Sequence, residues 1–131
     1  VLSDCDSVEK FVLERLTRED VREKIHFKPL GHFLKTSAGE WFPFDFVGRF
    51  ERFADDFETV KRRVNPQAVL KHRNRTNGVA PGSYLDGYTS EMIDAVARIY
   101  AEDIEAFGYT FDGYQDMVPK LSMRNPEGLR S

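Results

Sequence analysis

The stretch FDFVGRFERFADDF, residues 44–57, changes its pattern halfway along. Its first half has apolar residues at positions of both parities, which is typical of a strand buried on both faces. The sequence therefore predicts a strand over Phe44 to Phe50. From Arg52 onward the apolar residues recur at helical spacing instead, which predicts a helix from Arg52 to Val64.

Two charged residues, Arg49 and Glu51, stand at the end of this predicted strand. The simpler interpretation is that both side chains are exposed where the strand ends. The alternative is that Glu51 pairs with an arginine and so orders a binding site. The local pattern alone leaves both interpretations open.

Helical spacing also recurs on both sides of this stretch. It predicts a short amphipathic helix from Ser7 to Leu16 and a longer helix that begins at Thr89 or Ser90. The longer helix is predicted to end near Phe107, because Gly108 is a natural stop signal. Its predicted buried stripe consists of Met92, Val96, Ile99, Tyr100, Ile104 and Phe107. Between the helices, residues 25–43 are rich in proline, glycine and aromatic residues and predict a long ordered loop, a kind of segment that often carries function.

The bulk composition indicates a globular protein. The chain has 131 residues, of which 40% are hydrophobic and 31% charged, so we expect a single domain over residues 1–131. The net charge of -3 argues against a nucleic-acid partner. The single cysteine, Cys5, fits a reducing compartment such as a bacterial cytoplasm, and no apolar run is long enough to span a membrane. Because the chain begins at Val1, we expect either a missing N-terminal part or the trimming of a few residues.

The charges are unevenly distributed along the chain. Residues 59–85 contain no acidic residue, whereas residues 86–116 contain eight acidic residues and a single basic one, Arg98. The basic segment includes the run KHRNRTNG at 71–78, whose arginines, amides and hydroxyl suit a phosphate or sulfate group. The alternative is a solvated polar loop. Asn74 to Thr76 also matches a glycosylation sequon, which matters only on a secretory route.

Histidine is the usual general base near neutral pH, and the chain has three: His26, His32 and His72. The first lies in the run IHFKP at 25–29, where Pro29 restricts the preceding residue. The alternative is that these histidines are hydrogen-bonded structural groups. Their spacing is not that of a metal site, so no metal ligand is predicted.

Taken together, these segments resemble the C-terminal half of carbohydrate-type sulfotransferases, the family of the chondroitin and dermatan sulfotransferases and many bacterial relatives. Five elements match in order over residues 8–111, although each one alone is short. They are a His-aromatic-x-Pro element at His26 to Pro29, a strand pattern at Asp45 to Glu51, a helix with Asp-Phe, an H-x-N-x-[ST] loop at His72 to Thr76, and a final Y-x-x-D-x-x-x-F-G-Y helix at Tyr100 to Tyr109.

The resemblance implies a fold and a chemistry. The fold would be of the α/β type, the C-terminal portion of a P-loop-nucleotide-kinase-like sulfotransferase, mostly helical with one or a few parallel strands. The reaction would transfer a sulfuryl group from 3'-phosphoadenosine 5'-phosphosulfate (PAPS) to a hydroxyl, commonly of a carbohydrate. By the same resemblance, His26 is the catalytic candidate, Arg73, Asn74, Arg75 and Thr76 are the PAPS-binding candidates, and Lys28, His32, Arg49 and Glu51 lie on the acceptor side.

One departure from the family pattern is substantial. The N-terminal strand-loop-helix that grips the phosphosulfate, and the Arg and Ser that bind the 3'-phosphate, have no counterpart in this sequence. The chain is therefore expected to be the partial, acceptor-binding half of such an enzyme. Two alternatives remain: a non-catalytic module that binds an anionic ligand through Lys71 to Arg75, and a remnant that covers its apolar surface by forming a homodimer.

Overall fold

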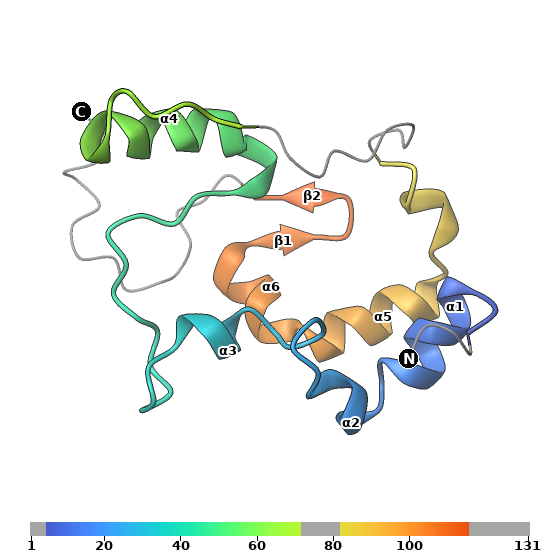
Figure 1. Ribbon diagram of the computed structural model, residues 1–131. Coiled ribbons are helices and arrows are strands. Elements are labelled where there is room, and N and C mark those ends of the chain that lie inside the picture. Colours follow the sequence, from blue (N-terminus) through green and yellow to red (C-terminus); the bar gives the residue numbers. More distant parts are fainter. Residues whose placement is uncertain (1–4, 72–81, 116–131) are drawn as a thin grey trace. The chain divides into compact units, whose positions relative to one another are not determined.

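The computed structural model describes residues 5–71 and 82–115, which fall into two compact units: 5–41 with 82–115, and 42–71. The first unit begins with α1 (Val8–Lys10), a π-helical turn (Phe11–Arg15) and α2 (Glu19–Arg22). It continues with α3 (Gly31–Leu34), a 3-10 turn (Leu85–Gly87), α5 (Ser90–Ile99) and α6 (Ala101–Phe107), and ends with strands β1 (Tyr109–Thr110) and β2 (Gly113–Tyr114) (Figure 1). The second unit holds a 3-10 turn (Phe50–Arg52) and α4 (Phe53–Val64).

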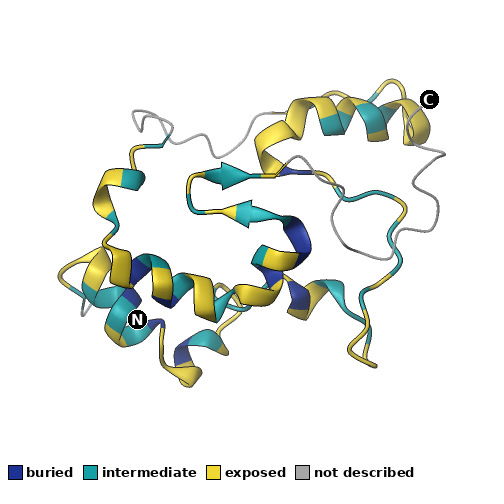
Figure 2. Cartoon of the chain, turned by 180° about the vertical axis from the view of Figure 1, so that it is seen from behind, coloured by how far each residue is buried: buried dark blue, intermediate teal, exposed yellow. Residues whose placement is uncertain are grey.

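The core of the first unit forms where the π-helical turn packs against α5. Val12, Met92 and Ala95 are its buried members, and Met92 is fully enclosed. Buried residues line the inner faces of these helices, as the dark blue segments in Figure 2 show. The partly buried residues that pack on this cluster are Phe11, Leu13, Tyr88 and Val96.

The two signals that bound the longest predicted helix are confirmed. The Thr89 hydroxyl accepts a hydrogen bond from the Met92 backbone N–H and caps α5. Gly108 has a φ of 68°, the left-handed conformation that commonly ends a helix. Between these points the structure has two helices, α5 and α6, where the sequence predicted one, because Tyr100 leaves helical geometry at φ -108° and ψ 23°.

The strand predicted over Phe44 to Phe50 is wrong. Residues 44–49 form no ladder, and Glu51 lies in the 3-10 turn that leads into α4. The apolar pattern of residues 44–50 favours a strand, but a strand also needs a neighbouring strand to pair with its backbone groups. Here the Arg49 N–H instead donates to the Asp56 carboxylate at 2.7 Å.

About half of the described part of the chain is helical and it has one small sheet, which agrees with an α/β class only at the coarsest level. Its two strands pair antiparallel, with Tyr109 opposite Tyr114, so the parallel pairing that we expected is not found in residues 5–71 and 82–115. The predicted helix from Arg52 to Val64 is confirmed as α4.

Candidate functional site

The loop between α2 and α3 carries two of the predicted site residues, His26 and Lys28, and a third, His32, lies in α3. His26 lies on an exposed turn, which the Phe27 N–H closes by donating to the Lys24 carbonyl. The Lys28 ammonium lies 3.4 Å from His32 Nε2 and 3.1 Å from a carboxylate oxygen of Glu23. The structure therefore brings Lys28 and His32 together, as a cation beside an imidazole.

A buried carboxylate from α6 holds the end of this loop. The two oxygens of Asp103 accept hydrogen bonds from the backbone N–H groups of Leu30, at 2.6 Å, and Gly31, at 2.9 Å. Asp103 is only 8% exposed. Gly31 packs closely here: a Cβ at this position would lie 3.3 Å from Asp103 Oδ1 and 3.2 Å from the Trp41 ring, so both side chains would have to shift slightly. These contacts set the start of α3 against α6 (Figure 1).

A second link from the same helical stretch reaches the middle of the loop. The Tyr100 hydroxyl donates to the Phe27 carbonyl at 2.8 Å. Burial raises the pKa of Tyr100 above its ordinary value, and the negative charge of Asp103 adds to this rise. Tyr100 is therefore held as a neutral donor, and together with Asp103 it fixes the loop at two points. We call these three hydrogen bonds the loop clasp.

A pocket of about 570 Å³ lies beside the clasped loop. It is lined by Pro29, Gly31, His32, Lys35, Thr36, Ser37 and Glu102. Lys35 forms an ion pair with Glu102, and its ammonium lies 4.9 Å from the centre of the Trp41 ring. The Thr36 hydroxyl oxygen is buried and has no hydrogen-bond partner within residues 5–71 and 82–115. The pocket lining thus includes an imidazole, a lysine paired with a carboxylate, and the exposed Ser37, a set that suits a polar ligand.

Among the predicted site residues that the structure describes, His32 lines this pocket, whereas His26 and Lys28 lie on the clasped loop beside it. Arg49 and Glu51 belong to the second unit, where Arg49 is buried at 7% exposure and Glu51 is exposed. The expectation that both side chains are exposed at a strand end is therefore wrong for Arg49. Arg73, Asn74, Arg75 and Thr76, the predicted PAPS-binding residues, lie outside the described residues.

Sequence reasoning missed most of the residues that build the site. Tyr100 and Asp103 were matched to the final motif, but neither was assigned a role. The run Lys35-Thr36-Ser37 carries a usable signal, since it places a cation and two hydroxyls together in the predicted functional loop. Glu102 gives no such signal, because it is one of many acidic residues on that helix.

Residues 5–71 and 82–115 lack two further features. No group of three histidine, cysteine, aspartate or glutamate side chains there could hold a metal ion. No helix in the same part of the chain is both long enough and apolar enough to cross a membrane. In comparisons with known proteins, no family model, no curated protein and no solved structure matches this chain.

Proposed function

We propose that this chain forms the acceptor side of a PAPS-dependent sulfotransferase, which transfers a sulfuryl group to a hydroxyl, commonly of a carbohydrate. The observation that carries the proposal is the loop clasp. Its bond from the Tyr100 hydroxyl to the Phe27 carbonyl joins two of the five elements on which the resemblance rests, although the two residues are 73 positions apart. The other two bonds hold Leu30 and Gly31, which directly follow the first of these elements, against Asp103 in the second. This contact supports the proposal that the two elements belong to one site.

In the proposed reaction an acceptor oxygen forms a bond to sulfur while the bond from sulfur to the phosphate oxygen of PAPS breaks. The acceptor proton passes to a base, and adenosine 3',5'-bisphosphate leaves. His26 remains the proposed base, because its ring has no hydrogen-bond partner in the described part of the chain, whereas His32 Nε2 faces the Lys28 ammonium. Lys28 and Lys35 would offset the charge on the sulfuryl oxygens.

The other parts of the proposal rest on the sequence resemblance. Arg73, Asn74, Arg75 and Thr76 are proposed to bind PAPS, and Arg49 and Glu51 to order neighbouring loops. The P-loop-nucleotide-kinase-like fold, the homodimer and the cytoplasmic setting remain predictions.

The first test is calorimetry with adenosine 3',5'-bisphosphate, using the chain and then the whole product of its coding sequence. We expect one-to-one binding that Arg73→Gln weakens about tenfold, through the loss of one charge-assisted contact. Arg62→Gln removes the same charge from the exposed face of α4 and should leave binding unchanged. If the whole product does not bind the bisphosphate, the proposal is wrong.

The second test is transfer of labelled sulfuryl groups from PAPS to a panel of oligosaccharides by the whole gene product. Replacing the proposed base, His26→Ala, should lower kcat by about a hundredfold and leave bisphosphate binding unchanged. Unchanged turnover would remove His26 from the mechanism. Salt-sensitive binding of sulfated glycans without any transfer would favour the non-catalytic module.

A further inference from the structure

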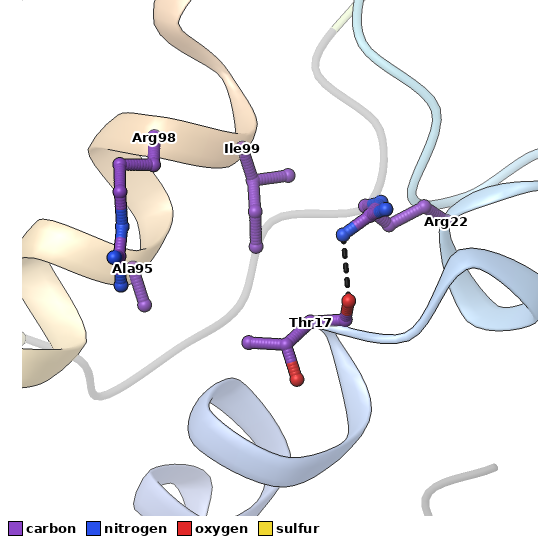
Figure 3. A pocket seen from close by; sticks show the side chains of 5 residues that line it. All are labelled: Thr17, Arg22, Ala95, Arg98 and Ile99. Carbon is purple, nitrogen blue, oxygen red and sulfur yellow. Dashed lines mark hydrogen bonds between the residues drawn. The ribbon is translucent and has the colours of Figure 1, made fainter.

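The two longest helices, α5 and α4, differ in how far their apolar faces are covered. On α5, in the first unit, Met92 and Ala95 are buried in the core. Ile99, at the end of α5, is half-buried and lines a pocket of about 440 Å³, beside which Arg22 Nη1 donates to the Thr17 carbonyl at 2.6 Å (Figure 3). In the second unit, by contrast, no residue of α4 is buried, although the helix has 12 residues.

The apolar side chains of α4 are spaced for packing against another helix. They are Phe53, Phe57, Val60 and Val64, and the steps between them are four, three and four residues. Alternating steps of three and four are those of the a and d positions through which two packed helices meet. Phe53 is 52% exposed and Val64 is 77% exposed. We call these four residues the α4 seam.

The side chains of the α4 seam are ordered by size. Both phenylalanines lie in the first half of α4, and both valines lie in the second half. Two copies in antiparallel orientation would place Phe53 against Val64 and Phe57 against Val60. Each layer of the contact would then hold one large and one small side chain, which fills the space evenly. Parallel copies would instead stack phenylalanine on phenylalanine and valine on valine.

The charges of α4 favour the same orientation, because its first turn is acidic and its last turn is basic. These residues are Asp55 and Asp56 in the first turn, and Lys61, Arg62 and Arg63 in the last turn. In an antiparallel pair the acidic end of each copy meets the basic end of the other, whereas a parallel pair brings like charges together. Asp56 already pairs with Arg52, and Lys61 with Glu58. The charges therefore set the orientation, and the seam supplies the affinity.

We propose that the α4 seam binds the α4 seam of a second copy of this chain, in antiparallel orientation. The occupant is a second copy because the two halves of the seam complement each other in size and charge, and a two-fold axis brings such halves together. A helix of 12 residues is about 18 Å long, so one pair buries less area than an interface of standard size. We expect a weak dimer, with a dissociation constant on the order of 100 µM. This inference gives the expected homodimer a specific interface and does not depend on the proposed transfer reaction.

The first test is sedimentation equilibrium of the whole chain, from about 10 µM to about 1 mM, with a reductant that keeps Cys5 from crosslinking. Val64→Ser in the seam and Val69→Ser outside α4 are a matched pair, because both valines are 77% exposed. Each dimer contains the seam contact twice, so Val64→Ser should weaken dimerisation at least about tenfold, and Val69→Ser should leave it unchanged. An equal loss in the two variants would overturn the proposal. A chain that stays monomeric over this range would overturn it as well, and would leave the seam to another part of the same chain or to solvent.

Disulfide trapping tests the orientation. In a chain that carries Cys5→Ser, the variants Phe53→Cys and Val64→Cys are mixed in equal amounts and equilibrated in a glutathione buffer. An antiparallel seam brings position 53 of one copy beside position 64 of the other, so the mixed disulfide should exceed its statistical share in a mass spectrum. An excess of the two symmetric disulfides would indicate parallel helices, and a statistical mixture would indicate no defined interface. Either result would contradict the proposal.

Discussion

The loop clasp makes a quantitative prediction for Asp103→Asn. Both carboxylate oxygens of Asp103 accept a backbone N–H, at 2.6 and 2.9 Å. An asparagine keeps one acceptor oxygen but turns its NH₂ toward the second N–H, so one bond is lost and a buried donor is left unpaired. A hydrogen bond to a charged group contributes about 1.5–3 kcal/mol, and Leu30 is exposed enough for water to replace part of this. We therefore expect the free energy of unfolding to fall by about 2 kcal/mol.

A loss of this size leaves a domain of ordinary stability folded, so the variant can be measured by chemical denaturation and amide hydrogen exchange. Exchange at Leu30 and Gly31 should accelerate more than exchange in the core around Met92. The matched control is Asp94→Asn, the same chemical change at an exposed position of α5. The free energy of unfolding of this variant should stay within about 0.5 kcal/mol of that of the parent protein. Equal stability of the two variants, or unchanged exchange at Leu30 and Gly31, would refute the reasoning.

Three other predictions follow from single contacts. Tyr100→Phe removes the bond to the Phe27 carbonyl and should cost about 1 kcal/mol in chemical denaturation. The pKa of Tyr100 is raised in the folded protein, so the stability that Tyr100 contributes is complete below the unfolded pKa of about 10 and is lost as pH rises through the folded pKa. The Tyr100→Phe variant should lack this loss of stability at alkaline pH. In a phenolate absorbance titration, the variant should show one late-titrating tyrosine fewer. Thr89→Ala should cost about 1 kcal/mol through loss of the cap on α5, measured by thermal unfolding beside Ser90→Ala as control. Gly108→Ala should cost about 1–2 kcal/mol, since its φ of 68° strains any residue with a Cβ; Gly87→Ala, where a Cβ meets only open space, is the control.

Helix positions could be predicted from the sequence because their signals are local. The caps at Thr89 and Gly108 and the periodicity of α4 act within a few residues of the backbone that they order. The break at Tyr100 was not predicted, because the apolar pattern continues through it. That break sits where the Tyr100 hydroxyl bonds to a loop 73 positions away, a contact that no local pattern contains.

Burial was harder to predict than helix formation. The stripe of α4 was read from spacing alone, yet none of its residues is buried, and Phe53 and Val64 are 52% and 77% exposed. Periodicity shows which face of a helix is apolar, but it does not identify what covers that face. The predicted strand failed for a related reason, since the apolar pattern does not identify a neighbouring strand, and residues 44–49 pair with none in the described part of the chain.

The candidate site was half predicted. Residue chemistry singled out His26 and His32, the family resemblance added Lys28, and the structure brings Lys28 and His32 together. Residue chemistry could not single out Asp103, because a carboxylate in an acidic helix is usually solvated. Only its burial and its two backbone partners distinguish it from the neighbouring Glu102.

Glu102 and Asp103 are adjacent in sequence, yet they have different roles at the pocket beside α3: Asp103 fixes the loop, and Glu102 pairs with Lys35 in the pocket wall. Asp103 is satisfied by backbone N–H groups, so its charge fixes the position of the loop and is not available to a ligand. Glu102 is exposed and neutralises Lys35 in the pocket wall, so it lowers the positive potential that an anionic ligand would meet. The Lys35 side chain is partly buried, but Glu102 is exposed and its charge is screened by water, so an anion can compete with Glu102 for the lysine without disturbing the clasp. The geometry therefore separates the residue that builds the pocket from the residue that tunes its charge.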